Sequence, residues 1–310
     1  MLYCDTIIVF GTKNKLINWR KTRKGISTYN LKKIDKALLA KIPLTYKKDP
    51  RDDRDYIFRT LRPECDDPKL SLPSSYDHTK DMSPVKDQGQ LGSCVGFAVA
   101  AMKEAQEKKE HEAELAKGKR GRKKEYNYSE AWLYWNSKRL DPWPDEEGTS
   151  IRFAMQVLHR KGVPTEKAWP YKDVGDIGKP ENWSKLVARW ALIGSYWRIQ
   201  TLTELKVALL DTPVPIGIPC FYEIFFVGSN GIVPYPANPR QIYGGHAVCA
   251  IAYDDTKKLI KFKNSWGKSW GDNGYGYLPY KYVEDFLWDA WVAKDIAVTN
   301  EMLQGTRTLT

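Results

Sequence analysis

A cysteine at the start of an apolar helix is the first residue of this chain that could do nucleophilic chemistry. Cys94 follows a loop, residues 83–93, that holds a proline and two glycines, and it precedes apolar residues at helical spacing. A cysteine attacks as its thiolate, and the free N–H groups and the dipole of a helix N-terminus favour that charge. A small buried core cysteine would fit the same position. A nearby imidazole would favour the catalytic interpretation.

His246 is the histidine whose surroundings suit that role. The chain has 4 histidines, and this one lies in an apolar stretch directly after two glycines, which let a substrate or another backbone segment approach closely. The stretch runs to Tyr253. The turn residues 254–257 then predict a hairpin whose second strand spans residues 258–264.

The apolar pattern of this hairpin favours a register in which the numbers of facing residues sum to 510. His246 then faces Asn264, and Val248 faces Phe262, so that one face is apolar and carries the polar pair at its end. Facing residues have Cβ atoms about 4.5–5.5 Å apart, which would let Asn264 hold the imidazole in one orientation. A sum of 511 would place Asn264 on the opposite face, and the pattern does not prove the register.

Gln88 adds a possible oxyanion donor. It precedes Cys94 in the glycine-containing loop. Its amide and the backbone N–H of Cys94 could both donate to an oxygen that gains negative charge during attack on a carbonyl group. A solvated loop glutamine is the alternative if Gln88 is taken by itself.

The elements that must position these residues change in type along the chain. Helical patterns cover residues 93–115, with Ser93 at the expected N-cap, and residues 150–160 and 202–210. From Pro213 onward the pattern is one of short apolar strands bounded by turn residues. A helical first half and a β-rich second half predict an α+β protein of two lobes.

Three segments resemble the papain family of cysteine peptidases. KDQGQLGSCVGFA is similar to the segment around the papain and cathepsin nucleophile, GGHAVCAIAY to the histidine segment, and KNSWGKSWGDNGYGYLP to the asparagine segment. The resemblance covers residues 72–298 and keeps the family's order of motifs. It implies a two-lobe fold, a helical lobe and an antiparallel β-barrel-like lobe with the active-site cleft between them. It also implies an endopeptidase that works through a Cys94 thioester.

Further roles follow from the resemblance alone. Trp266 would shield the His246–Asn264 hydrogen bond from water. Gly148 and Thr149 resemble the stretch that pairs with the substrate backbone. Three residues are expected to line the pocket for the side chain two positions before the scissile bond: Ile151, Gly217 and Ala247. Gly245, beside the catalytic histidine, is also expected to bind substrate. That pocket would prefer an apolar side chain.

Some residues depart from the usual family pattern. Leu91 stands where relatives carry a cysteine, so the disulfide that braces secreted members is missing, and Val95 replaces a common aromatic residue. The Arg54–Tyr56 stretch also resembles the disulfide-free prokaryotic or viral branch. The chain has 5 cysteines, and no recognisable signal peptide. We therefore expect a cytoplasmic protein, with secretion by another route still open.

The domain boundaries follow from a change in composition. Residues 1–71 are basic and weakly periodic, and residues 72–310 form the expected peptidase domain, with a helical lobe over 72–190 and a β-rich lobe over 191–300. Two hypotheses fit residues 1–71: an inhibitory extension that makes the chain a zymogen, or a structural strap on the surface. The basic run Lys117–Lys124 is expected to be a solvated loop, with a polyanion-binding patch as the alternative.

The composition of the chain limits which substrates, cofactors and other partners we expect. The formal net charge is +11, but no nucleic-acid-binding motif accompanies it, so we expect protein or peptide substrates and a monomer. We expect no metal, because no cysteines and histidines stand at metal-ligand spacing, and no other cofactor. No stretch is apolar for long enough to span a membrane. A catalytically silent binding module and an acyl-transferring relative remain the competing hypotheses.

Overall fold

The computed structural model describes residues 42–118, 126–172, 185, 188 and 191–295. Within these ranges, no helix has the length and apolar character needed to cross a lipid bilayer. Two predicted features lie partly outside the described residues. They are the first 41 residues of the predicted extension, which include Cys4, and the part of the basic run that follows Gly118.

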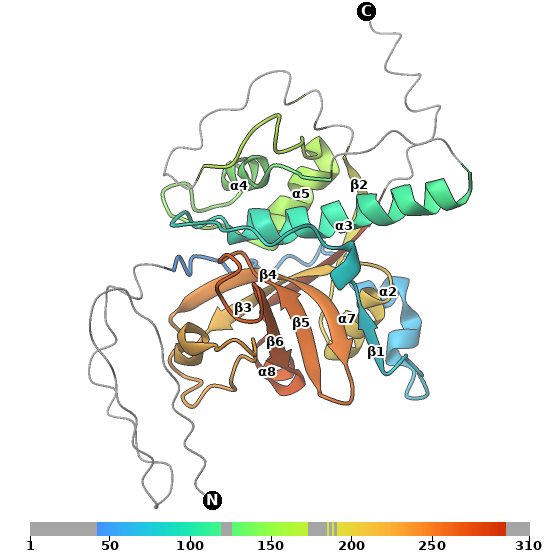
Figure 1. Ribbon diagram of the computed structural model, residues 1–310, viewed down its shortest axis with the longest axis vertical. Coiled ribbons are helices and arrows are strands. Elements are labelled where there is room, and N and C mark those ends of the chain that lie inside the picture. Colours follow the sequence, from blue (N-terminus) through green and yellow to red (C-terminus); the bar gives the residue numbers. More distant parts are fainter. Residues whose placement is uncertain (1–41, 119–125, 173–184, 186–187, 189–190, 296–310) are drawn as a thin grey trace, which may run out of the picture. The chain divides into compact units, whose positions relative to one another are not determined.

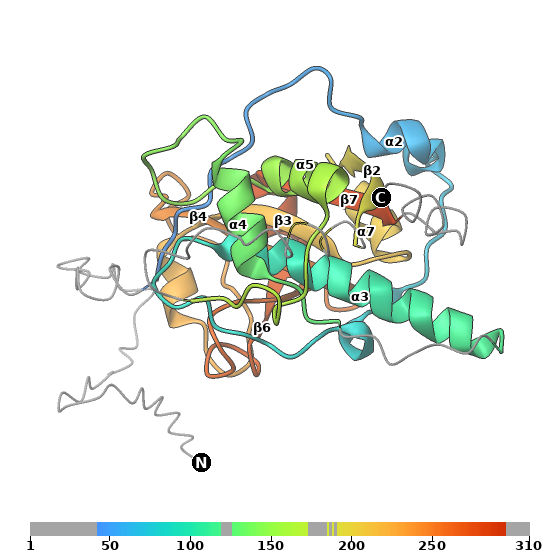
Figure 2. The same cartoon turned by 90° about the horizontal axis from the view of Figure 1, so that it is seen from above.

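Three helices form the helical lobe, and they lie over strands β3 and β4 (Figures 1 and 2). They are α3 (Cys94–Ala116), α4 (Glu130–Lys138) and α5 (Ile151–Lys161). The α4 helix, which the sequence did not predict, is capped by Ser129, whose Oγ accepts the Trp132 N–H at 3.1 Å. The α5 helix ends at Gly162, where φ of +70° favours glycine.

The second lobe is built on an antiparallel sheet. Its strand order is β2-β7-β3-β4-β5-β6, and β1 pairs with the C-terminal end of β4, beyond the residues that pair with β3. The strands are β1 (Ser75–Asp77), β2 (Ile193–Arg198), β3 (Val214–Cys220), β4 (Gly244–Asp254), β5 (Leu259–Lys263), β6 (Tyr275–Pro279) and β7 (Asp289–Asp295). The short helices are α2 (Phe58–Leu61), α7 (Leu202–Leu209) and α8 (Tyr280–Phe286), with 3₁₀ turns η1 (Pro63–Asp66), η2 (Thr79–Asp81) and η3 (Tyr222–Phe226). The predicted α+β class is confirmed.

Strand β4 separates two hydrophobic cores. Ala247, Cys249 and Ile251 pack with the buried face of α3, whereas Val248 and Ala250 pack into the core on the other side of the sheet. The alternation follows from the two-residue repeat of a strand. A strand buried on both faces reads as the continuous apolar run seen in the sequence.

The predicted hairpin exists, but its predicted register is wrong. The ladder pairs Cys249 with Lys263 and Ala250 with Phe262, a sum of 512, and a bulge then moves the pairing to Tyr253 with Ile260. The bulge near Ile251 adds an unpaired residue, which the apolar pattern did not reveal. Asn264 lies just beyond the last pair, so it approaches His246 diagonally and not from directly opposite.

The described part of the predicted extension packs onto the sheet lobe. Phe58 is 3% exposed in the second core, and Ile57 forms a parallel bridge with Arg198. Strand β1 follows residue 72 and pairs with β4, so this part of the predicted helical lobe belongs to the sheet. Residues 42–49, called here the inter-lobe segment, run between the helices and the sheet (Figure 1).

A buried lysine joins the long helix to the sheet lobe. Lys103 of α3 is fully buried, and its Nζ lies 2.5 Å from Asp295 Oδ2 and 2.9 Å from Glu107 Oε1. The same ammonium donates to the Leu192 carbonyl at 3.1 Å. A buried cation is tolerated only with such a complete set of partners.

Replacing Lys103 with methionine should therefore destabilise the fold. We expect Lys103→Met to lower the free energy of unfolding by about 3–5 kcal/mol, because it removes the cation that two nearly buried carboxylates share. Urea unfolding followed by circular dichroism measures the change. Lys108→Met on the same helix, where the side chain is 32% exposed, is the control and should cost under about 1 kcal/mol. Equal losses in both variants would contradict the role given to Lys103.

Candidate active site

Cys94 is the first residue of α3, as the sequence predicted. Its side chain is fully buried, and its Sγ accepts the Ala247 N–H from β4 at 3.4 Å. The N–H groups of Val95 and of Cys94 itself also point to the sulfur. Ser93 is at the N-cap, but its side chain makes no capping bond and its Oγ instead lies 2.5 Å from Tyr171 Oη. The sulfur therefore sits among free N–H groups of a helix start, where a thiolate would be stabilised.

His246 and Asn264 lie in contact. His246 Nε2 is 2.8 Å from Asn264 Oδ1, and that oxygen also accepts the Ser265 N–H at 2.8 Å. Because Oδ1 is an acceptor, Nε2 carries the hydrogen of the neutral ring. Nδ1 is then the basic nitrogen, and it is buried without a hydrogen-bond partner among the described residues. The geometry leaves that nitrogen free to take a proton.

Trp266 covers the imidazole. Its ring stacks on that of His246 with a centroid separation of 4.2 Å and an interplanar angle of 25°. His246 is 1% exposed and Asn264 is 3% exposed. A hydrogen bond kept from water in this way is stronger than an exposed one, because the local dielectric constant is low.

Gln88 is fixed in the loop before α3. Its Oε1 accepts the Ser265 hydroxyl at 2.6 Å, and its Nε2 donates to the Leu91 carbonyl at 3.0 Å. The amide nitrogen has two hydrogens, and the Leu91 bond uses one of them. Ser265, the residue that follows Asn264, thus connects the loop of Gln88 to the asparagine segment. This link was not predicted from the sequence, because it depends on two distant loops meeting.

The inter-lobe segment crosses the site through a passage lined by glycines. Tyr46 N–H donates to the Gly245 carbonyl at 3.0 Å, and Lys47 N–H donates to the Thr149 carbonyl at 3.0 Å. A Cβ at Gly148 would lie 1.8 Å from the Thr45 carbonyl oxygen. The residues that the sequence assigned to substrate backbone thus contact a piece of the chain's own backbone.

The expected side-chain pocket contains Tyr46. Ile151 and Ala247 belong to the same buried cluster as Tyr46, and a Cβ at Gly217 would lie 2.2 Å from the Tyr46 ring. Tyr46 is 3% exposed, and its hydroxyl donates to Asp289 Oδ2 at 2.7 Å. Neither Tyr46 nor Asp289 was predicted from the sequence, because neither lies in a motif and only the fold brings them together.

Burial sets the protonation of the covered centre. It raises the pKa of the Cys94 thiol to about 12, although the N–H groups around the sulfur act in the opposite direction. It lowers the pKa of His246 to about 4, against the effect of the Asn264 hydrogen bond. Both shifts favour a neutral thiol and a neutral imidazole at neutral pH. The covered state therefore disfavours the charged pair that nucleophilic attack requires.

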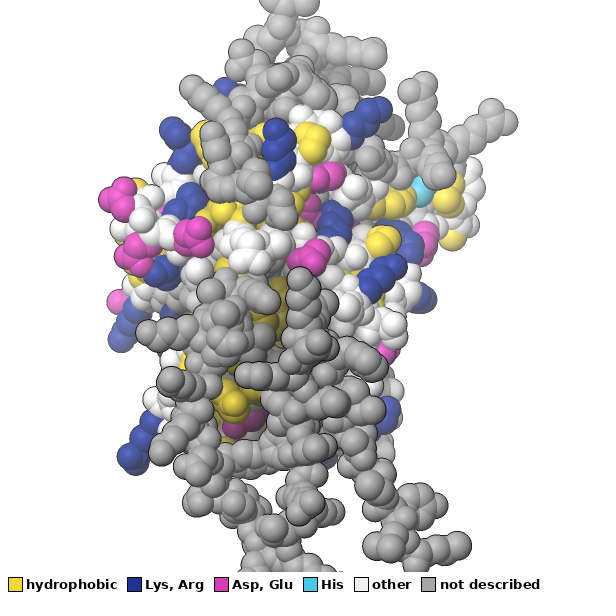
Figure 3. Space-filling model, turned by 60° about the vertical axis from the view of Figure 1, so that its left-hand side comes forward, with side chains coloured by type: hydrophobic (Ala, Val, Ile, Leu, Met, Phe, Trp, Pro, Cys, Tyr) yellow, Lys and Arg dark blue, Asp and Glu magenta, His cyan; other side chains and the backbone are white. Residues whose placement is uncertain are grey.

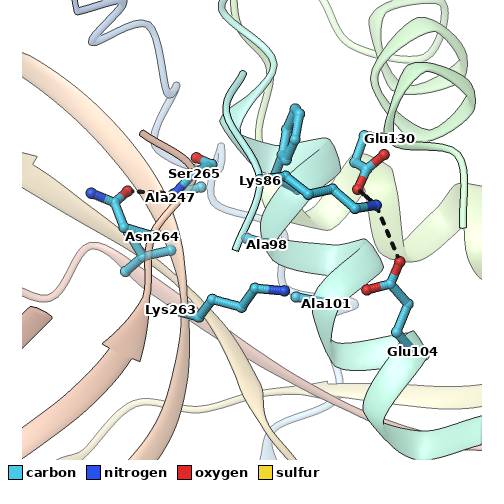
Figure 4. Close-up of a pocket in the computed structure, with 11 residues that line it drawn as sticks. Lys86, Ala98, Ala101, Glu104, Glu130, Ala247, Lys263, Asn264 and Ser265 are labelled. Carbon is cyan, nitrogen blue, oxygen red and sulfur yellow. Dashed lines mark hydrogen bonds and ion pairs between the residues drawn. The ribbon is translucent and has the colours of Figure 1, made fainter. Parts of the chain in front are cut away.

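A cluster of largely buried charged side chains lies near Asn264, around the partly exposed Lys86 (Figure 4). Lys86 pairs with Glu130 and lies 3.5 Å from Glu104, and Lys263 lines the same small pocket. Although burial acts to lower it, the two carboxylates hold the pKa of Lys86 above its ordinary value. These ion pairs connect the loop of Gln88 to both helices α3 and α4. They support the site and do not enter the passage that the inter-lobe segment occupies.

Comparison with known proteins gives one consistent result. A model described as papain family cysteine protease matches residues 72–283. An uncharacterised peptidase C1-like protein of Acanthamoeba polyphaga mimivirus is 32% identical over 225 residues, 68% of this chain and 69% of that protein. Cathepsin K of Mus musculus is 30% identical over 220 residues, 67% of this chain and 60% of its own length.

Solved structures agree in fold. Xylellain, a cysteine protease from Xylella fastidiosa, is similar with a TM-score of 0.68 and 27% identity, over 82% of this chain and 96% of its own. Digestive procathepsin L 3 of Tenebrio molitor has a TM-score of 0.61 at 22% identity, over 84% of this chain and 78% of its own, and shares the fold.

The protonation of the covered centre predicts slow alkylation of Cys94. In the full chain, iodoacetamide should react with Cys94 at a rate that rises about tenfold per pH unit between about pH 7 and 10, because the thiolate fraction rises in that way below the thiol's pKa. Peptide mapping by mass spectrometry separates this modification from that of the half-buried Cys65. Fast, pH-independent alkylation near pH 6 would show that the charged pair already exists.

Proposed function

This chain belongs to the papain family of cysteine proteases, and we propose that it is an endopeptidase in which Cys94 forms a thioester with the substrate. Its two-lobe α+β fold is that of the papain-like structures it matches. The observation that carries the proposal is Nδ1 of His246, which is buried and has no hydrogen-bond partner among the residues that the structure describes. Asn264 fixes the opposite nitrogen of that ring, and Cys94 lies against the next residue of the same strand.

The proposed reaction begins with proton transfer from the Cys94 thiol to His246 Nδ1. The thiolate attacks the carbonyl carbon of the peptide, and the carbonyl oxygen becomes an oxyanion. His246 then gives its proton to the leaving amine, which departs as the C–N bond breaks and the thioester forms. The same nitrogen then takes a proton from a water molecule, whose oxygen attacks the thioester carbonyl carbon. The C–S bond breaks, Cys94 leaves as its thiolate, and the acid product is released. Asn264 takes no proton and keeps the imidazole in its orientation.

The oxyanion requires donors that are held in place before the reaction. The Cys94 N–H lies at the start of α3, where it has no acceptor within the helix. Gln88 is held by Ser265 and Leu91, and its amide keeps a second hydrogen for the substrate oxygen. Donors fixed in advance stabilise developing charge without reorganisation, a contribution of about 2.7–4 kcal/mol for one donor elsewhere.

We infer that the inter-lobe segment restrains activity, so that the chain is a zymogen in the sense that its own residues cover the site. Tyr46 occupies the side-chain pocket, and its main chain bonds the backbone of Gly245. A substrate peptide would need the same space. Withdrawal of the segment would also let water reach Cys94 and His246, and so reduce the penalty on their charged forms.

The pocket walls support a preference for an apolar side chain at the second position before the scissile bond. Ile151 is fully buried, Ala247 is 1% exposed, and Gly217 leaves room for a large group. Such a pocket gains energy from the apolar area it removes from water. Protein or peptide chains are the substrates that this arrangement fits.

We further place the protein in the cytoplasm, as a monomer. Support comes from its cysteines, since Cys65, Cys94, Cys220 and Cys249 are all free, and from Leu91 at the position of the missing disulfide. The net charge of +11 needs no nucleic-acid partner, because Lys, Arg, Asp and Glu side chains are interspersed on the face shown in Figure 3. Fractionation of the producing cells checks the location.

Removing the anchor of the inter-lobe segment should activate the full chain. Tyr46→Ala deletes a buried aromatic side chain, worth about 3–5 kcal/mol elsewhere, and we expect at least a tenfold rise in turnover of a fluorogenic peptide library. Tyr56→Ala is the matched control, since Tyr56 is 70% exposed and should leave the rate unchanged. Unchanged turnover in Tyr46→Ala would contradict an inhibitory role.

The catalytic assignment is tested in the Tyr46→Ala background. Cys94→Ala should abolish hydrolysis while leaving the melting temperature nearly unchanged, because only one buried sulfur is lost. Asn264→Ala should reduce kcat on the order of 100-fold, since a misplaced group still reacts, but slowly. Undiminished turnover by Cys94→Ala would show that the nucleophile lies elsewhere. Mass spectrometry with an added amine distinguishes hydrolysis from acyl transfer.

A further inference from the structure

The pocket that holds Tyr46 has apolar walls and a charged floor. The Tyr46 ring lies against Gly217 and stacks on Trp288, with ring centroids 6.3 Å apart at 27°. At its far end the hydroxyl donates to Asp289 Oδ2 at 2.7 Å. The Asp289 side chain is completely buried. A buried carboxylate at the bottom of an otherwise apolar pocket must be matched by donors from whatever fills the pocket.

The donors to Asp289 come from two sources. Arg198 Nη2 bonds Oδ1 and stays with the sheet lobe, since Arg198 belongs to β2. The Tyr46 hydroxyl and the Asp49 N–H, at 2.9 Å, both bond Oδ2 and both belong to the inter-lobe segment. When the segment leaves, Oδ1 keeps its partner and Oδ2 loses these two. In the open pocket, Asp289 Oδ2 would be an exposed acceptor without these two donors.

We propose that Asp289, paired with Arg198, makes this pocket selective for a tyrosine side chain of the substrate. The inference rests on the proposed function, and it sharpens the apolar preference of the pocket walls. The substrate phenol would take the place of Tyr46, with its ring between Gly217 and Trp288 and its O–H donating to Oδ2. Asp289 is a specificity-determining residue in this view and takes no part in bond breaking.

Phenylalanine would fit the walls but not the floor. Its ring would cover Asp289 Oδ2 without supplying a donor, and a buried acceptor left unpaired is costly. Sites built to bond a substrate hydroxyl reject the analogue that lacks it, more strongly than apolar pockets reject a change of one methylene. A tyrosine substrate should therefore be used about 10- to 100-fold more efficiently than its phenylalanine counterpart.

Lysine and arginine side chains would meet a carboxylate that is already paired. After Asp49 leaves, the floor cluster contains two guanidinium groups, Arg152 and Arg198, and two carboxylates, Asp55 and Asp289. Arg152 and Arg198 side chains are 5% and 16% exposed, so their charges are weakly screened. A third cation would have to share Asp289 with Arg198, and its desolvation would not be repaid.

The test compares peptide substrates that differ only at the second residue before the scissile bond. The full-length protein is assayed with tyrosine, phenylalanine and lysine at that position, and kcat/KM is measured for each. The inter-lobe segment competes equally with all three, so the covered fraction cancels from their ratios. We expect the tyrosine substrate to exceed phenylalanine about 10-fold or more, and lysine to be the poorest of the three.

Two variants test whether the selectivity for tyrosine depends on Asp289 and Arg198 at the floor of the pocket. The double variant Asp289→Leu with Arg198→Met removes both charges together, which buried pairs tolerate, and it should bring the tyrosine-to-phenylalanine ratio to about one. The single variant Arg198→Met leaves Asp289 unpaired and should raise lysine relative to phenylalanine by about 10-fold or more. Because each result is a ratio within one preparation, partial misfolding does not alter it.

The outcomes separate the two proposals. A ratio near one in the unmodified protein, or a tyrosine preference that survives in the double variant, would overturn the role of Asp289 and leave the peptidase assignment standing. No turnover of any of the three substrates, in the full chain and in Tyr46→Ala, would overturn the peptidase proposal and the pocket selectivity with it.

Discussion

The contact between α3 and β4 is the constraint on which the rest of the structure depends. The nucleophile candidate begins the helix and the base candidate lies in the strand, so their separation is fixed only by how the lobes pack. Cys94 Sγ reaches the Ala247 N–H at 3.4 Å, a contact that tolerates little displacement. Small residues on α3, such as Ala98 and Ala101, allow this close approach of helix and strand.

Ion pairs of α3 stabilise the helical lobe and tie it to the sheet. Lys86 joins Glu104 of α3 and Glu130 of α4, and Lys103 joins α3 to the end of β7. Such pairs stabilise a fold weakly by themselves, because desolvation offsets most of the attraction. They do specify geometry, since displacement of α3 from β7 would leave the buried Lys103 and Asp295 without each other as partners. The site thus gains precision from interactions whose net contribution to stability is small.

Glycines on both lobes create the space that the inter-lobe segment fills. Gly148 and Gly217 lack the Cβ atoms that would collide with Thr45 and Tyr46. The same absence of side chains would admit a substrate backbone, so one passage serves an internal occupant and an external one. Occupancy also sets the charge state, because a covered thiol and imidazole are both driven toward neutrality. Displacement of the segment and formation of the charged pair are therefore coupled.

The sequence alone determined the type of fold and predicted the groups that we propose to react. Cys94, His246, Asn264 and Gln88 lie in motifs whose residue types follow from the chemistry, and helical and strand periodicities are local properties of the chain. The helices at residues 93–115 and 150–160 were found for that reason. The α4 helix was missed, because its aromatic and polar residues show little amphipathic periodicity and its stability comes from packing.

Only the tertiary structure decided what surrounds those groups. The hairpin register differs from the predicted one already at the turn, where Asp254 pairs with Leu259, and the bulge in β4 changes it by one further residue, which leaves no mark in an apolar pattern. Tyr46 meets Asp289 across 243 positions of sequence, so no local signal connects them. The protonation of Cys94 and His246 likewise depends on burial by a distant segment. The residue types that a reaction needs can be recognised in short sequence motifs. The side chain that fills the pocket and the pKa values of the groups in the site depend on contacts that form only when the chain folds.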